Sequence, residues 1–258
     1  RAYRFVDNSK AYDTVDSAEV FGKSGKAFGR FQKYLSDFPA ESLSEIIKNF
    51  HNTIWRYENE FIPAVQADKA DRAVNCGEEI KFVMHRREDC KKLVELIEKG
   101  ELPLRVTHND TKLNNVLFDS DSDDAICVID LDTVMPGLAL YDFGDSIRFG
   151  ANSCAEDDDN YDKVELMLDY FEAYAKGFLS EAGDALNQCE IDNLAFSAKL
   201  MTFECGMRFL TDYLNGDTYF KTAYPEHNLV RAKNQFALVA DMERKMEQMQ
   251  QIIKNITE

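Results

Sequence analysis

The segment from Val106 to Val134 concentrates side chains that could carry chemistry, including seven aspartates and one histidine. Within it, Asp110 is followed five residues later by Asn115, and Asp130 ends an apolar run 20 residues after Asp110. Phosphoryl transfer to a hydroxyl needs a carboxylate near the hydroxyl proton and oxygen ligands for the Mg²⁺ that bridges the nucleotide phosphates. Asp110 can serve the hydroxyl, while Asn115 and Asp130 can supply the metal ligands.

Two other interpretations fit part of the same segment. Asp130 and Asp132 match the nucleophile and general-acid positions of haloacid-dehalogenase-type phosphatases, which also use Mg²⁺. That motif usually ends the first strand of a parallel sheet, whereas the residues after it here have a mainly helical pattern. Asp110 and Asn115 would then have no explanation, unless they only form a polar Asx turn.

The segment after Asp110 is flanked by elements that must position it, and most of these are predicted helices. Apolar residues three and four apart indicate helices, and short β-rich runs separated by polar turns indicate strands. The predicted helices cover 17–35, 53–68 with a break at Pro63, 78–99 ending at Gly100, a segment reaching 178, 190–214 and 229–253. The predicted strands cover 1–6, 104–107, 115–118 and 125–129.

The stretch FGKSGK, Phe21 to Lys26, has some likeness to a phosphate-binding loop. It lacks the first glycine of the GxxxxGK[ST] pattern, because residue 17 is serine. We therefore expect small residues on a helix rather than a nucleotide site.

Composition limits the classes of protein that the chain can represent. Its 258 residues are 45% hydrophobic and include 18 Phe and 11 Tyr, enough for an aromatic-rich core. A net charge of −17 argues against nucleic acid and anionic membrane surfaces as partners. No apolar run is long enough for a membrane span, and no signal peptide is visible. Six cysteines without CxxC pairing fit reduced thiols, and we expect a cytoplasmic protein.

The catalytic segment HNDTKLNN resembles the HxDxxxxN loop of the aminoglycoside/choline phosphotransferase family, relatives of protein kinases, and IDLDT resembles its metal-binding segment. RAYRF, KAFGRFQKYLSDFPA, NFHNTIWRY and FECGMRFLTDYLNGDTYFK resemble its N-acetylhexosamine 1-kinase branch. The resemblance implies an α+β, mainly helical fold, the large C-terminal lobe of a protein-kinase-like fold, with a small β-hairpin region that carries the catalytic loop.

The same resemblance implies an activity and a set of roles. ATP would be the co-substrate, Mg²⁺ the cofactor, and the anomeric 1-hydroxyl of N-acetylglucosamine or N-acetylgalactosamine the acceptor. Asp110 would orient or deprotonate that hydroxyl, and Asn115 and Asp130 would hold Mg²⁺. Aminoglycoside or choline-type kinases and a non-catalytic sugar-binding module remain alternatives.

Three further polar residues are candidates for supporting roles around this loop. His108 opens the catalytic motif, and Asp132 could contact sugar, act behind the metal ligands, or only be solvated. Asp142 opens a DFG triplet 32 residues after Asp110, too far along the chain to match Asp130. We expect Asp142 to be structural, accepting backbone hydrogen bonds from the catalytic loop.

Mainly by the same resemblance, Phe149 and Arg208 are the candidates for acceptor recognition. Hexose binding commonly uses an aromatic face and a planar donor that can address several oxygens. The alternative is that Phe149 belongs to the core and Arg208 pairs with Glu204, one helical turn earlier.

The sequence contains no GxGxxG loop and no V-A-x-K strand before the catalytic segment. The family resemblance then implies that residues 1–14 are a hinge strand and linker from an N-terminal nucleotide-binding lobe that precedes this chain, and that residues 15–258 are the C-terminal lobe. The isolated chain is then expected to have negligible kinase activity. The sequence leaves the oligomeric state open.

Overall fold

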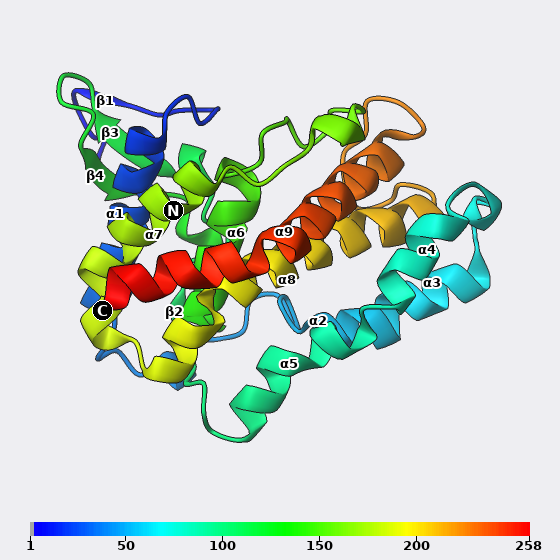
Figure 1. Cartoon of the computed structure of the whole chain (residues 1–258), viewed down its shortest axis with the longest axis horizontal. Coiled ribbons are helices and arrows are strands. Elements are labelled where there is room, and N and C mark those ends of the chain that lie inside the picture. The colour runs from blue at the N-terminus through cyan, green and yellow to red at the C-terminus, as the bar shows by residue number, and fades with distance from the viewer. Residues whose placement is uncertain (1–2) are drawn as a thin grey trace.

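Helices dominate the chain, as the apolar periodicity predicts, and two small antiparallel sheets accompany them (Figure 1). The computed structural model describes residues 3–258. The helices are α1 (Ala18–Tyr34), α2 (Thr53–Arg56), α3 (Ile62–Ala67), α4 (Gly77–Met84), α5 (Arg87–Glu98), α6 (Ala139–Gly150), α7 (Leu168–Ala182), α8 (Gln188–Asn215) and α9 (His227–Thr257). The strands are β1 (Ser9–Lys10), β2 (Arg105–Thr107), β3 (Val116–Asp119), β4 (Ala125–Val128) and β5 (Met135–Gly137). The α+β, mainly helical class is therefore confirmed.

The two sheets flank the catalytic segment. β1, β3 and β4 form one antiparallel sheet in that order, with Val116 opposite Val128. β2 and β5 form the other, with Thr107 opposite Met135. The catalytic loop connects β2 of one sheet to β3 of the other, so both sheets fix its ends.

Helix α1 confirms the helical interpretation of FGKSGK. Its N-terminus is capped by Ser17, whose hydroxyl accepts a hydrogen bond from the N–H of Val20 at 3.2 Å. Its glycines allow close packing on α7: a Cβ on Gly25 would lie 2.5 Å from the carbonyl oxygen of Tyr174. The small residues therefore serve helix packing.

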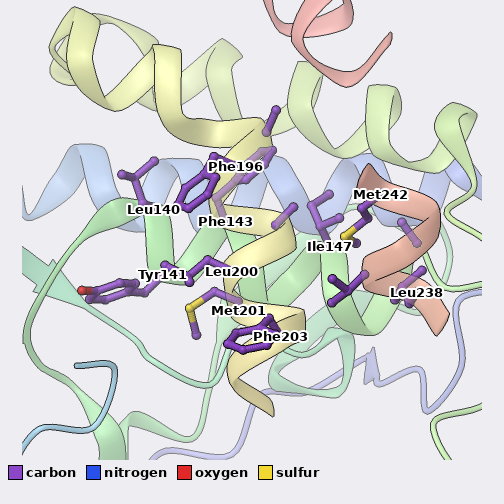
Figure 2. Packing of buried hydrophobic residues seen from close by; sticks show 14 of the residues in the cluster. Leu140, Tyr141, Phe143, Ile147, Phe196, Leu200, Met201, Phe203, Leu238 and Met242 are labelled. Atoms are coloured by element: carbon purple, nitrogen blue, oxygen red, sulfur yellow. The ribbon is translucent and has the colours of Figure 1, made fainter. Parts of the chain in front are cut away.

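The core is centred on α6, α8 and α9. Figure 2 shows apolar side chains of the three helices meeting, among them Phe143, Ile147, Phe203 and Met242. The long helices α8 and α9 run side by side through the molecule (Figure 1). Helix α8 starts in a capping box formed by Asn187 and Glu190, and its side chains face both the core and the candidate site.

Three predictions about elements need correction. Residues 3–6 form no strand, since Tyr3 and Phe5 are exposed without a partner strand; Arg1 and Ala2 lie outside the described residues. Pro63 does not interrupt the second helical segment, because a π-helical turn over Tyr57–Phe61 precedes it and accommodates its missing N–H.

The third correction concerns the predicted helix over 78–99, which is two helices, α4 and α5. At the break, the guanidinium of Arg86 lies 3.4 Å from the ring centroid of Phe82 and pairs with Glu243 of α9. Gly100, with φ +73°, ends α5 at the predicted position. Among the described helices, none has the length and apolar character needed to cross a membrane.

Candidate active site

The catalytic loop is tied at its start to the segment that follows Asp130. Asn109 adopts a left-handed conformation with φ +65°, and its side-chain amide donates to the carbonyl oxygens of Thr107 at 3.1 Å and Thr133 at 2.9 Å. In return, the Thr133 hydroxyl donates to the carbonyl oxygen of His108 at 2.7 Å. The segment that contains Asp110 is thus hydrogen-bonded to the segment that contains Asp130.

Asp142, on α6, supports the loop from the core side. Its carboxyl oxygens accept hydrogen bonds from the backbone N–H groups of His108 at 2.9 Å and Asn109 at 2.8 Å, and from the Gln32 amide at 2.7 Å. Burial raises the pKa of Asp142, while His108 and these donors favour its charged form. Both carboxyl oxygens of Asp142 are therefore engaged by the backbone of the loop. Asp142 does not take the role of the metal-binding aspartate in the DFG motif of protein kinases.

Asp145 and Arg148 extend this support along the same face of α6. Asp145 accepts a hydrogen bond from the backbone N–H of Thr111 at 3.2 Å and pairs with the Arg148 guanidinium at 2.9 Å. Burial would raise the pKa of Asp145, but Arg148, Lys112 and His51 lower it overall. Asp145 and Arg148 were not among the site residues predicted from the sequence. Their three-residue spacing after Asp142, on one helical face, was the available signal.

Asp110 is partly exposed, and both of its carboxylate oxygens have partners in the loop. Lys112 Nζ lies 3.0 Å from Oδ1, and Asn115 Nδ2 donates to Oδ2 at 3.1 Å and to the Asp110 carbonyl oxygen at 2.8 Å. Burial would lower the pKa of Lys112, but the Asp110 and Asp145 carboxylates raise it overall. Lys112 was not among the site residues predicted from the sequence, although it lies only two residues from Asp110.

His108 connects the loop to the residue before Asp130. Its Nδ1 accepts a hydrogen bond from the Asp110 N–H at 3.3 Å, so its Nε2–H is free to donate to the carbonyl oxygen of Ile129 at 2.8 Å. The ring packs edge-on against Phe28, with centroids 5.5 Å apart. His108 is fully buried and acts here as a cross-link.

Asn115 and Asp130 come together across the ends of β3 and β4. The N–H of Ile129 donates to the carbonyl oxygen of Asn115 at 2.9 Å, which places Asp130 beside the Asn115 backbone. Asn115 uses its amide nitrogen on Asp110, leaving its Oδ1 without a hydrogen bond from the described residues. Asp130 is exposed, has φ +59°, and forms no hydrogen bond or ion pair with the residues that the structure describes.

These two oxygen donors fit Mg²⁺, which proteins typically bind through one or two carboxylates together with substrate phosphates and water. Within residues 3–258, no group of three or more His, Cys, Asp or Glu side chains is placed to hold a metal. A metal at this position therefore depends on Asn115, Asp130 and the oxygens of a bound phosphate.

The phosphatase interpretation of Asp130 and Asp132 is wrong. Asp130 follows a strand of an antiparallel sheet, whereas in those phosphatases the motif usually ends the first strand of a parallel sheet. Asp132 is exposed on the short 3-10 turn Leu131–Thr133.

A cavity of about 460 Å³ opens beside Asp110 and contains charges of both signs. Its lining includes Asp110, Lys112, Arg148, Glu156, Arg208 and Arg231, with aromatic rings between them. The guanidinium carbon of Arg208 lies 5.2 Å from the ring centroid of Phe50, 5.5 Å from that of Phe220 and 5.8 Å from that of Tyr219.

Arg208 has no ion pair with Glu204, contrary to the alternative interpretation. Glu204 instead accepts hydrogen bonds from His51 at 2.8 Å and Thr53 at 2.6 Å. Arg208 makes no hydrogen bond or ion pair with any residue in the described part of the chain, so its N–H donors remain available to a ligand. Phe149 is half-buried and lines a separate hollow of about 310 Å³, so it is not brought together with Asp110.

Comparison with known proteins assigns the family. The phosphotransferase enzyme family APH matches residues 1–177 of this sequence, so the chain belongs to that family. Its fold resembles that of an ethanolamine kinase from Plasmodium vivax (17% identity, TM-score 0.56), covering 90% of this chain and 64% of that one. It also resembles a choline kinase from Cryptosporidium parvum (15% identity, TM-score 0.57), covering 98% of this chain and 72% of that one.

The chain thus spans less than two thirds of the length of the ethanolamine kinase. The expected family is confirmed, and the structural likeness shows a shared fold. At these identities, it says nothing about which acceptor the chain binds.

Proposed function

We propose that the chain carries the catalytic loop and acceptor site of an ATP-dependent phosphotransferase that acts on a small-molecule hydroxyl. The observation that carries the proposal is the arrangement around Asp110. A partly exposed carboxylate faces a cavity, and two oxygen donors, Asn115 and Asp130, lie at the adjoining strand ends. This is the set of groups that transfer of a γ-phosphoryl group to a hydroxyl requires.

The acceptor hydroxyl would donate a hydrogen bond to the Asp110 carboxylate. This bond would align the hydroxyl oxygen for in-line attack on the γ-phosphorus. A new oxygen–phosphorus bond forms as the bond between the γ-phosphorus and its bridging oxygen breaks, and ADP leaves. Asn115 and Lys112 hold the two carboxylate oxygens in place, so Asp110 needs little reorganisation. An anomeric hydroxyl is more acidic than an ordinary alcohol, so a weak carboxylate base is sufficient.

Asn115 Oδ1 and the Asp130 carboxylate are the residues that would hold Mg²⁺. The ion supplies positive charge that offsets the charge on the nucleotide phosphates. The role of this chain is to fix the two ligands: both lie at the same end of the paired strands β3 and β4, and His108 anchors the backbone before Asp130.

The acceptor that we propose is N-acetylglucosamine or N-acetylgalactosamine. Arg208 supports it, since a planar guanidinium with unused N–H donors can address hydroxyl and acetamide oxygens. The same guanidinium lies within cation–π distance of the rings of Phe50, Tyr219 and Phe220. A quaternary ammonium group would need these aromatic faces for its own cation–π contacts. The site therefore favours a neutral polyhydroxylated acceptor over choline.

We also propose that the 258-residue chain by itself turns over ATP negligibly. Its sequence has no glycine-rich loop and no strand lysine to hold the nucleotide phosphates. Robust ATP turnover by this chain alone would contradict this part of the proposal.

The acceptor is tested by calorimetric titration of the chain with N-acetylglucosamine, N-acetylgalactosamine, choline and kanamycin. Arg208→Ala should abolish measurable hexosamine binding, and Asp110→Asn should weaken it. Asp121→Asn, an exposed carboxylate at the β3–β4 hairpin tip, is the matched control and should bind like the wild type.

Saturable binding of a hexosamine, sensitive to Arg208 and Asp110 but not to Asp121, would support the proposed acceptor. Binding of choline or kanamycin alone would keep the phosphotransferase assignment and overturn the sugar. If none of the four compounds bound, either the acceptor site would not be complete within this chain or the acceptor would be another compound, and the proposed binding of a hexosamine by this chain would be wrong.

A further inference from the structure

His51 lies in the wall of the Asp110 cavity with one ring nitrogen unused. The residue is only 8% exposed, and its ring is surrounded by Phe50 and Tyr141, with centroids 4.4 and 5.1 Å away. Its Nε2 is buried and has no hydrogen-bond partner among the described residues. Buried polar atoms are rarely left unpaired, because an unmade hydrogen bond costs stability.

The other ring nitrogen is held firmly. His51 Nδ1 donates to Glu204 Oε1 at 2.8 Å, and Glu204 also accepts a hydrogen bond from the Thr53 hydroxyl at 2.6 Å. Glu204 is 1% exposed and lies on α8 one helical turn before Arg208. The carboxylate therefore fixes the plane of the imidazole ring, and with it the direction of Nε2.

Two features place the His51 side chain beside the acceptor cavity. His51 lines the cavity together with Asp110 and Arg208. It is also close enough to Asp145 for its charge to help lower the pKa of that carboxyl, after the larger effects of Arg148 and Lys112.

We propose that His51 Nε2 forms a hydrogen bond with a hydroxyl group of the acceptor, and that this contact selects polyhydroxylated acceptors over choline. The inference rests on the proposed function and deepens it. A hydroxyl satisfies Nε2 in either protonation state, because it can accept from the N–H of a charged ring or donate to the lone pair of a neutral one. Choline has a single hydroxyl group, which Asp110 would engage, and its trimethylammonium group can neither donate nor accept a hydrogen bond. Choline would therefore leave the nitrogen unpaired.

His51 also lines a second hollow, of about 420 Å³, to which Phe50 contributes as well. That hollow contains exposed glutamates at its rim and does not include Asp110. If Nε2 served only that hollow, or if His51 served only to support Glu204 through Nδ1, acceptor affinity would not depend on Nε2.

Two substitutions separate these roles, since each keeps one of the two nitrogens. In His51→Asn, the shorter amide reaches the position of Nδ1, so it preserves the bond to Glu204 and removes the donor at Nε2. In His51→Gln, the longer amide reaches the position of Nε2 and gives up the bond to Glu204. Affinity for N-acetylglucosamine and N-acetylgalactosamine is measured by calorimetry on the 258-residue chain, and unfolding by urea for each variant.

We expect His51→Asn to weaken hexosamine binding by about tenfold or more, the loss expected for one buried hydrogen bond, while remaining folded. His51→Gln should bind hexosamine better than His51→Asn and be the less stable of the two. Unchanged hexosamine affinity in His51→Asn would overturn the inference and leave the proposed function intact. Binding of choline alone, or of no compound, by the wild type would overturn the proposed acceptor and this inference with it.

Discussion

Replacing Asp142 with asparagine tests how the catalytic loop is held. The change preserves the size of the side chain and exchanges one carboxyl oxygen for an NH₂ group. In the structure, the two oxygens of Asp142 receive the N–H groups of His108 and Asn109 and the amide of Gln32. An asparagine oxygen can replace only one of the two acceptors, so the NH₂ group must face a donor.

The cost follows from that count. In the better orientation, the new oxygen serves His108 and Gln32, while the N–H of Asn109 and the new NH₂ group are left unpaired in a fully buried position. Each unsatisfied buried group costs about 1–3 kcal/mol, so we expect a loss of about 2–6 kcal/mol in the free energy of unfolding. At about 2–4 °C per kcal/mol for a chain of this size, even a loss of about 3 kcal/mol lowers Tm by about 6–12 °C.

Urea unfolding followed by circular dichroism measures this loss as a shift in the midpoint at unchanged slope. Asp121→Asn is again the control, because this exposed carboxylate should change stability by no more than about 0.5 kcal/mol. If Asp142→Asn lost less than about 1 kcal/mol, the carboxyl group would not support the loop in the manner described.

Two further predictions concern the core. Gly25→Ala places a Cβ 2.5 Å from the carbonyl oxygen of Tyr174, so we expect it to lower the free energy of unfolding in urea by about 1–3 kcal/mol. Gly77→Ala is the control: the space around its Cβ is open, so the free energy of unfolding should change by no more than about 0.5 kcal/mol. Equal losses in the two variants would refute the packing argument. Burial raises the pKa of the Cys90 thiol to about 12, so iodoacetamide at pH 8 should label Cys90 only after unfolding, as mass spectrometry would show. Labelling of native Cys90 as fast as that of the less buried Cys127 would count against its burial.

Local signals account for the parts of the fold that could be predicted. Ser17 caps α1 and Gly100 ends α5, and both signals depend on nearby residues alone. The break between α4 and α5 could not be predicted in this way, because it involves Arg86 pairing with Glu243 on α9, 157 residues away. The strand predicted over 1–6 is absent from residues 3–6 for a related reason. Alternation of polar and apolar residues does not show whether another strand is available to pair with the segment.

The residues of the candidate site also differ in whether nearby sequence alone could predict them. Asp110, Asn115 and Asp130 lie within one segment, so their spacing alone was enough to select them as candidates. His51 and Glu204 are 153 residues apart, and only the folded chain shows that they share a hydrogen bond. Phe149 was selected by resemblance to a family pattern, and its half-buried position in another hollow depends on how the end of α6 packs.

Helix α6 also has a consequence for altering acceptor preference by protein engineering. On one face its carboxyl groups hold the catalytic loop, and on another Gly144 packs so closely on α8 that a Cβ would lie 2.5 Å from the carbonyl oxygen of Ser197. The match to the APH family ends at residue 177, before α8. A library confined to the cavity-facing positions of α8 and to the Tyr219 segment would therefore vary one wall of the Asp110 cavity while keeping the loop from His108 to Asn115 fixed. Positions on α6 should be excluded from such a library, since changes there would disturb both the support of the loop and the packing of α6 on α8.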